Sequence, residues 1–206
     1  MNKAPMNKIA VFGAKGNMGR RYCLILKRFT HVEAIEFDMN SGDESKLKSC
    51  DGFIIATPTE THYALINQIA KYRKPILCET PVVKNREKLN SLLSIDGIDL
   101  SMVNQYAFIQ SRKLSFNDDK HTYFNYYNTG NDGLLWDCIN IIGLAETSYD
   151  VKNDSPIWGC NINGYKLSLD YMDDAFVNNV VSWIRGWRNS DYIVKAHDKI
   201  WKEIYD

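Results

Sequence analysis

The segment Gly13-Ala14-Lys15-Gly16-Asn17-Met18-Gly19 decides how the first half of this sequence folds. The short apolar run Lys8–Phe12 precedes it and predicts a β-strand, and Asn17–Arg28 follows and predicts a helix. Glycines at this spacing between a strand and a helix are typical of a loop that cradles phosphate groups. The segment therefore predicts the start of a nucleotide-binding α/β domain.

Each glycine of this loop has a physical role. Gly13 permits the tight turn, Gly16 lets the backbone approach a pyrophosphate, and Gly19 lets the helix lie close to the sheet. The free amides and the dipole at the helix N-terminus favour an anion. We expect the phosphates of a dinucleotide to be bound by Gly13, Lys15, Gly16, Asn17, Met18 and Gly19.

An acidic residue at the end of the second predicted strand, Val32–Phe37, indicates which dinucleotide. Asp38 lies 19 residues after Gly19, where a carboxylate can hold both hydroxyls of the adenosine ribose and would repel a 2′-phosphate. We therefore expect NAD(H) to be favoured over NADP(H), although the nearby cations Lys15 and Arg20 would soften the preference. The alternative is a glycine turn that binds nothing, with Asp38 as a solvated strand end.

Alternating strand and helix patterns continue to about residue 103. The predicted strands are Gly52–Thr57, Pro75–Glu79 and Leu100–Val103, and the predicted helices are His62–Tyr72 and Arg86–Ser94. Apolar strands that alternate with helices form a parallel sheet covered on both sides. Residues 1–110 are therefore predicted to be a doubly wound Rossmann domain of the α/β class.

The second half has a different pattern. An aromatic strand is predicted over Thr122–Tyr127, and the strands Trp158–Ile162 and Tyr165–Tyr171 flank the hairpin signal Asn163-Gly164. Helices are predicted over Gly133–Ala145, Phe176–Trp187 and Asp191–Ile204. With the polar stretch Gln110–Lys120 as boundary, residues 111–206 are predicted to be a small α+β domain with a mainly antiparallel sheet.

Composition limits the classes of function. The 206 residues are 45% hydrophobic and 24% charged, and 25 basic residues balance 25 acidic ones, which argues against binding to nucleic acid or to a membrane surface. No apolar run approaches the roughly 20 residues of a membrane span, and no signal-peptide pattern opens the sequence. The five cysteines lack metal or disulfide spacing, so we expect a cytoplasmic protein with reduced thiols and no metal site.

Four further segments carry a family resemblance. Ala56-Thr57-Pro58-Thr59-Glu60-Thr61-His62 resembles an A-T-P-x-x-x-H stretch, and Cys78-Glu79-Thr80-Pro81 stands where the family has E-K-P. Met102–Phe108 resembles the segment that leads into the second domain, and Gly133–Asp137 resembles a G-x-x-x-D helix start. On these segments the sequence resembles the Gfo/Idh/MocA family of sugar and cyclitol oxidoreductases, as a compact version with a shortened sheet domain.

The resemblance implies where a cofactor and a substrate would lie. It implies a dinucleotide along the carboxyl ends of the strands, with Thr57, Pro58, His62 and Glu79 around its nicotinamide half. It also implies a small-molecule substrate between the nicotinamide and the sheet of the second domain. If the outer face of that sheet is apolar, the resemblance further implies a homodimer through it.

The sequence departs from the family at the residues that carry its acid–base chemistry. The lysine of E-K-P is Thr80, and the histidine of the substrate-side helix is Ile141 or, with a one-residue slip, Asn140. The acidic residue three positions further on is Leu144 or Gly143. None of these side chains acts as a base at neutral pH.

Two functions remain open on this evidence. The first is an NAD(P)-dependent oxidoreductase acting on a small sugar-like substrate or a conjugated carbonyl or imine, with Tyr106, Asn104 or His62 as proton donor and Asp137 orienting. The second is a catalytically inactive relative that binds the dinucleotide as a sensor, subunit or scaffold. His62 has an equally plausible role in packing.

Several histidines and tryptophans of the second half have expected roles in packing or solvation. We expect His121 and His197, which lie in polar segments, to be exposed to solvent. We expect Trp183, Trp187 and Trp201 of the two closing helices to be packing residues.

Overall fold

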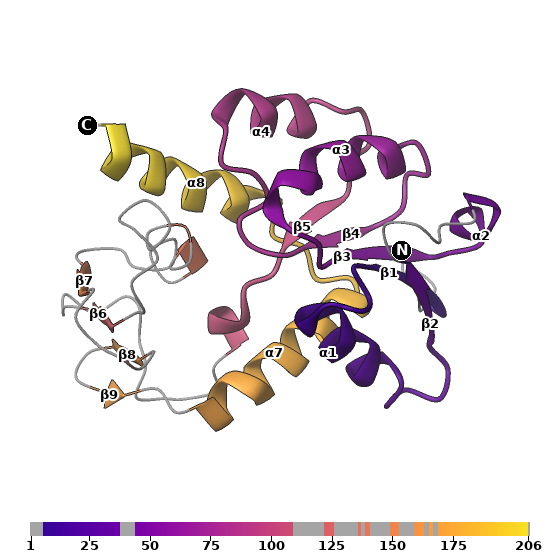
Figure 1. Ribbon diagram of the computed structural model, residues 1–206, viewed down its shortest axis with the longest axis horizontal. Coiled ribbons are helices and arrows are strands. Elements are labelled where there is room, and N and C mark those ends of the chain that lie inside the picture. Colours follow the sequence, from indigo (N-terminus) through magenta and orange to yellow (C-terminus); the bar gives the residue numbers. More distant parts are fainter. Residues whose placement is uncertain are drawn as a thin grey trace. The chain divides into compact units, whose positions relative to one another are not determined.

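Figure 1 shows the computed structural model of the chain, which divides into two compact units. The first comprises Met1–Val103 and Val180–Ser190, and the second comprises Asn104–Asn179 and Asp191–Asp206. The structure describes residues 6–37, 44–108, 122–125, 136, 139–140, 149–152, 159–162, 165–166 and 169–205.

The first unit is built on a sheet of five parallel strands, in the order β2-β1-β3-β4-β5. These are β1 (Lys8–Phe12), β2 (Glu33–Phe37), β3 (Gly52–Ile55), β4 (Ile76–Cys78) and β5 (Leu100–Met102). The predicted parallel sheet is thus confirmed, with each predicted strand present within a few residues of its expected ends. The strand order reverses between β1 and β3, and ligands of such sheets bind at the carboxyl ends of the strands beside that switch point.

Four helices connect these strands. They are α1 (Asn17–Leu26), α2 (Glu44–Lys48), α3 (Thr59–Ala70) and α4 (Arg86–Leu93). Figure 1 shows α3 and α4 on one side of the sheet and α1 on the other, as expected of a doubly wound fold. α4 begins where the Asn85 side chain accepts a hydrogen bond of 2.8 Å from the Lys88 amide. α2 was not predicted, because its five residues are too few to show an apolar period.

The core of this unit lies on both faces of the central strands. All four residues of β3 are buried, and the Phe53 ring lies 6.2 Å from that of Phe12 and 5.8 Å from that of Tyr72, between centroids. Ile66 and Ile69 of α3 are fully buried, because residues three apart on a helix share a face. An apolar run without alternation, as in Gly52–Ile55, is what a strand covered on both sides requires.

The segment 180–190 belongs to the first unit although it lies far away in the sequence. Trp183 is fully buried, and a Cβ added to Gly52 would lie 2.9 Å from its ring. The Asn189 side chain forms two hydrogen bonds with β5, accepting from the Met102 amide at 2.9 Å and donating to the Met102 carbonyl at 2.8 Å. Asn189 thus satisfies the backbone of the edge strand β5, as a further strand would.

The second unit contains a sheet of four strands, in the order β7-β6-β8-β9. These are β6 (Thr122–Asn125), β7 (Tyr149–Lys152), β8 (Gly159–Ile162) and β9 (Tyr165–Lys166). The β6–β8 and β8–β9 pairs are antiparallel, whereas β6 and β7 are parallel. Ile162 lies opposite Tyr165, so the hairpin predicted from Asn163-Gly164 is present. The sequence analysis missed β7.

Two long helices close the chain, α7 (Leu169–Ile184) and α8 (Ser190–Tyr205). α7 begins seven residues before the predicted Phe176, and the strand predicted to reach Tyr171 ends at Lys166. The short alternation in that stretch fits the period of a helix as well as that of a strand. Within the described residues, no helix is long and apolar enough to cross a membrane.

The expectation that His197 is exposed was wrong. Its side chain is fully buried, its Nδ1 lies 2.8 Å from the Ile193 carbonyl, and its ring lies 5.6 Å from that of Trp136 and 5.5 Å from that of Trp201, between centroids. The polar neighbours that suggested exposure point elsewhere on α8, because successive helical residues are rotated by about 100°. Trp183 and Trp201 are buried, as predicted for packing residues, and Trp187 is half-buried.

Candidate cofactor-binding site

The glycine loop follows β1 and is held between the ends of two neighbouring strands. The amides of Gly13 and Ala14 both donate to the carbonyl of Phe37 at the end of β2, at 2.9 and 3.2 Å. Gly13 has a φ of +78°, and a Cβ there would lie only 2.6 Å from the carbonyl oxygen of Ala56, which follows β3. Only glycine therefore fits at this turn.

The first turn of α1 lies directly on this loop. A Cβ added to Gly19 would lie 2.0 Å from the carbonyl oxygen of Gly13, which explains why a glycine stands at this position. Gly16 is the N-cap of α1 and supplies no side-chain hydrogen bond, so the amides of the first turn depend on another partner. Lys15, Gly16 and Asn17 are exposed, so an anion can reach these amides from solvent.

The segment after β3 is joined to the glycine loop across the switch point. The Ala56 amide donates to the carbonyl of Phe12 at 3.0 Å. The Thr61 hydroxyl lies 2.7 Å from the Thr57 hydroxyl and 2.7 Å from the Pro58 carbonyl, and it fixes the turn into α3. Thr57 is half-buried and Pro58 exposed, and both follow the carboxyl end of β3, the neighbour of the strand that leads into the glycine loop.

His62 connects the segment after β3 to the segment after β4. Its side chain is 1% exposed; its Nε2 lies 2.8 Å from the carbonyl oxygen of Thr57. Its Nδ1 lies 3.1 Å from the carbonyl oxygens of both Pro81 and Val82, with the Cys78 sulfur at 3.4 Å. Because backbone oxygens face both ring nitrogens, this geometry favours the packing role that the sequence left open.

Glu79, which ends the β4 segment, is paired with a tyrosine of α1. The Tyr22 hydroxyl donates to Glu79 Oε1 at 2.6 Å, and the Thr80 amide lies 3.3 Å from Oε2. Burial raises the pKa of Glu79, while these two donors and the charge of Arg21 oppose that rise. Burial and the neighbouring carboxylate raise the pKa of Tyr22 well above its ordinary value, so its proton stays in place.

The three predicted catalytic residues lie in different parts of the chain, and their grouping stays a prediction. Tyr106 lies in the 3-10 helix Gln105–Phe108 of the second unit and is 7% exposed, whereas His62 belongs to the first unit. Asp137, like the predicted ribose ligand Asp38, lies outside the described residues. Asn104 is buried, and its amide donates to the Asn179 side chain at 2.9 Å.

Sequence reasoning missed Tyr22, although a signal for it was present. It lies three residues after Gly19, on the buried face of α1, and a buried tyrosine hydroxyl usually has a hydrogen-bond partner. That partner, Glu79, is 57 residues away, so only the fold reveals the pair. Among the described residues, no group of histidine, cysteine and acidic side chains is placed to hold a metal ion.

Comparison with known proteins gives a family match for part of the chain and a shared fold for nearly all of it. Residues 27–95, about a third of the chain, match the model of the oxidoreductase family with an NAD-binding Rossmann fold. No curated protein matches the sequence.

Solved structures share the fold over nearly the whole chain. The dehydrogenase MviM from Clostridium difficile is 13% identical, with 96% of this chain and 98% of that chain covered and a TM-score of 0.74. A Gfo/Idh/MocA family oxidoreductase from Vibrio cholerae is 10% identical, with 94% of each chain covered and a TM-score of 0.71. The WlbA dehydrogenase from Thermus thermophilus, in complex with NAD and UDP-GlcNAcA, is 14% identical, with 95% and 94% covered and a TM-score of 0.66. Residues 27–95 thus match the model of this oxidoreductase family, and these solved structures share the fold over nearly the whole chain.

Proposed function

We propose that this protein binds NAD(H) in preference to NADP(H) and acts as an oxidoreductase on a small sugar-like substrate or a conjugated carbonyl or imine. The observation that carries the proposal is the glycine loop. Gly19 lies against Gly13, and Gly16, the N-cap of α1, supplies no side chain to cap the first turn of the helix. Such a turn, beside the switch point of a parallel sheet, suits the pyrophosphate of a dinucleotide.

Three groups of residues would bind the three parts of the proposed cofactor. The pyrophosphate is bound by Gly13, Lys15, Gly16, Asn17, Met18 and Gly19, and the adenosine ribose by Asp38. Thr57, Pro58, His62 and Glu79 surround the nicotinamide, which supplies the hydride or accepts it. The Glu79 carboxylate, held by Tyr22, favours the positively charged oxidised ring by Coulomb attraction.

The proposed proton chemistry falls to few groups. Reduction of a carbonyl leaves an oxygen that must gain a proton, and Thr80 stands where the family has a lysine. We assign the proton transfer to Tyr106, with Asp137 orienting it. His62 acts as a positioning residue, since its ring nitrogens lie against the carbonyls of the loops that hold Thr57 and Pro81.

A catalytically inactive relative that binds the dinucleotide is the second candidate. Two observations favour it: Thr80 stands where the family has a lysine, and His62 is enclosed with a backbone oxygen against each ring nitrogen. NADH binding without NADH oxidation, across a screen of conjugated carbonyls and sugar derivatives, would favour this candidate.

The cofactor site is tested best by a variant that keeps the fold and repels phosphate. Gly16 has φ of −71° and ψ of 167°, which any residue adopts, and aspartate is a preferred N-cap. A Cβ at Gly16 would lie 3.2 Å from the Gly13 carbonyl oxygen, a tight contact that should cost some stability and that the serine control shares. In Gly16→Asp, NADH affinity should fall at least about 100-fold, because the new carboxylate occupies the anion's place. Energy transfer from tryptophan to bound NADH measures the affinity.

Gly16→Ser is the matched control, since it caps the helix without a charge. We expect it to keep NADH affinity within about tenfold of the original. Equal affinity for NADH in Gly16→Asp and in the unaltered protein would overturn the proposed phosphate site.

The preference for NAD(H) depends on Asp38. Replacing it with alanine should weaken NADH binding about tenfold or more, because two hydrogen bonds to a charged acceptor are lost, and should leave NADPH binding unchanged or stronger. Titrations with both cofactors measure the two affinities. An equal loss for NADH and NADPH would contradict the ribose assignment.

A further inference from the structure

A cavity of the first unit lies at the ends of the strands opposite to the glycine loop. Its volume is about 550 Å³, within the roughly 300–1,000 Å³ of small-molecule sites. Asp51, Pro75 and Asp99, which line it, directly precede β3, β4 and β5. The cavity therefore opens at the amino ends of the strands, and we call it the amino-edge cavity.

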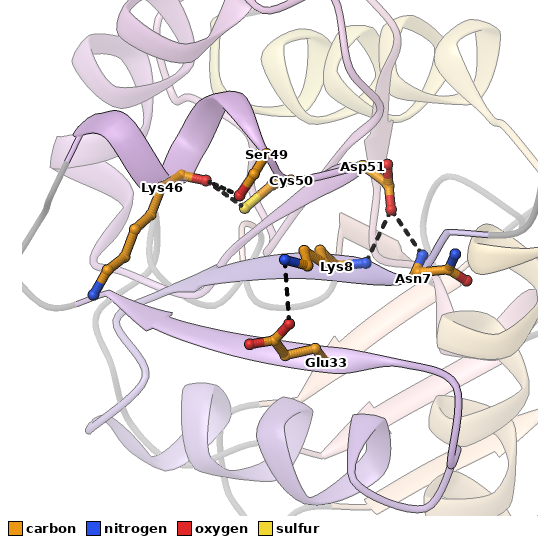
Figure 2. Close-up of polar contacts among 7 residues, drawn as sticks. All are labelled: Asn7, Lys8, Glu33, Lys46, Ser49, Cys50 and Asp51. Atoms are coloured by element: carbon orange, nitrogen blue, oxygen red, sulfur yellow. Dashed lines mark hydrogen bonds and ion pairs between the residues drawn. The ribbon is translucent and has the colours of Figure 1, made fainter.

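The carboxylates in this cavity are already engaged. Asp51 Oδ2 accepts hydrogen bonds from the backbone amides of Asn7 and Lys8, at 2.9 and 3.0 Å, as Figure 2 shows. Asp99 accepts a hydrogen bond from Arg188 Nε within an ion pair. The amides fix the Asp51 carboxylate in place and Arg188 neutralises Asp99, so the basic side chains of the lining, Arg73, Lys74, Arg185 and Arg188, outnumber these two acidic ones.

Two cations of the lining remain available. Lys74 and Arg185 line the cavity, and neither side chain has a hydrogen bond or ion pair with any residue that the structure describes. The carbonyls of Val181 and Trp183 at the end of α7 accept backbone hydrogen bonds from Arg185 and Gly186, so their negative ends are satisfied. The local charge is therefore positive, which attracts an anion.

The lining also has an apolar part, beside the polar side chains of His31 and Arg73. Met6, Phe29, Val181 and Ile184 line the same cavity as Lys74 and Arg185. An apolar wall with a few charged groups is the usual composition of a small-molecule site, in which the wall supplies affinity and the charge sets orientation. A simple inorganic anion would leave this wall uncovered.

We propose that the amino-edge cavity binds a small organic anion with an apolar body, such as an aromatic carboxylate, whose charge lies between Lys74 and Arg185. This site is separate from the glycine loop and does not depend on the proposed function. Because the two sites lie at opposite ends of the same strands, a ligand here leaves the cofactor site open.

The test uses the fluorescent dye anilinonaphthalene sulfonate, an aromatic anion, on the full chain. We expect saturable binding that persists with NADH present, and displacement by benzoate at lower concentrations than by benzyl alcohol. Lys74→Glu and Arg185→Glu should each weaken dye binding at least about fivefold, because attraction becomes repulsion. Neither substitution removes a hydrogen bond or ion pair within the described residues, so both variants should fold, as thermal unfolding checks.

Lys202→Glu is the matched control, because it reverses an exposed charge on α8 of the other unit and should change dye affinity by less than about twofold. Equal losses in all three variants would show an effect of net charge and overturn the proposal. Competition by NADH would place the dye in the cofactor site and also overturn it. Equal displacement by benzoate and benzyl alcohol would exclude recognition of the charge.

Discussion

In the first unit, the carboxyl ends of the parallel strands are held by backbone contacts, whereas side chains line the cavity at the amino ends. At the carboxyl ends, backbone lies against backbone: Gly13 against Ala56, and Gly19 against Gly13, with no space for a Cβ. At the amino ends, charged side chains border an open cavity, and the ion pair between Arg73 and Asp96 is largely exposed. One end is fixed by main-chain geometry, whereas the other is formed by side chains that can be exchanged.

The difference indicates at which end of the sheet the residues of a binding site also determine the stability of the fold. A site made by close backbone contact cannot change without disturbing the fold, because interiors at this packing density do not absorb an extra methyl group. A site made by exposed side chains can be altered with little effect on folding. We therefore expect substitutions at the contacting glycines Gly13 and Gly19 to cost stability, and those at exposed side chains of the amino ends to have little effect on folding.

The largest effect should come from Gly13→Ala. Gly13 and Gly97 have similar positive φ values of +78° and +71°, but a Cβ at Gly97 would meet no atom closer than 3.9 Å. Gly97→Ala should cost about 1–2 kcal/mol for the left-handed backbone. Gly13→Ala should cost at least about 3 kcal/mol because overlap with Ala56 adds to that strain. Urea unfolding of both variants measures the difference, and equal costs would remove the distinction between the two ends.

A smaller, pH-dependent effect is expected at the Tyr22–Glu79 pair. The unfolded Glu79 carboxyl titrates near 4.5 and the folded one at a higher pH, because burial penalises its charge. The native state thus holds the proton more tightly, so stability is greatest below 4.5 and falls as the pH rises through the window up to the raised pKa. Glu79→Gln, which cannot ionise, should lack this loss.

Replacing Tyr22, the hydrogen-bond donor to Glu79, should also have an effect on stability that depends on pH. Tyr22→Phe removes a donor to the carboxylate and should cost about 1–3 kcal/mol at about pH 8, and less at about pH 5, where more of the carboxyl is protonated. Urea unfolding at the two pH values measures both costs. An equal cost at both would mean that the hydroxyl contributes packing rather than a hydrogen bond to charge.

The smallest effect is expected at the amino ends. Arg73 and Asp96 are paired at 2.9 Å, but their side chains are 69% and 90% exposed, so solvent screens the attraction. Arg73→Ala should change the free energy of unfolding by less than about 0.5 kcal/mol. A double-mutant cycle with Asp96→Ala isolates the pair, and a coupling above about 1 kcal/mol would show that this end also contributes to stability.

Much of the first unit could be predicted from sequence because its signals are local. The glycine loop and the apolar strands Lys8–Phe12 and Gly52–Ile55 each show their pattern within a few residues. Residues of the second half with an equally local signal, such as the hairpin around Asn163-Gly164, were also found. Just before Phe176, the short apolar pattern fits both the period of a strand and that of a helix. It therefore did not decide between the predicted strand end at Tyr171 and the observed start of α7 at Leu169.

The rest depends on contacts between distant segments. Nothing local links Tyr22 to Glu79, and the amino-edge cavity combines Lys74 with Arg185, more than a hundred residues apart in the sequence. His197 was placed in solvent because its neighbours are polar, whereas two tryptophans enclose it. Such side chains acquire their environment only when the chain has folded.

Because segment 180–190 packs on the first unit, that unit cannot be encoded by one continuous gene fragment. A gene fragment that ended near residue 110 would encode the five parallel strands without the Trp183 that covers Gly52 and without the Asn189 that closes the edge at Met102. Its product would expose an apolar patch and an unpaired strand edge, both of which favour aggregation. The parallel-sheet half is therefore not a module that recombination can transfer by a single cut, and the two units are expected to have evolved as one chain.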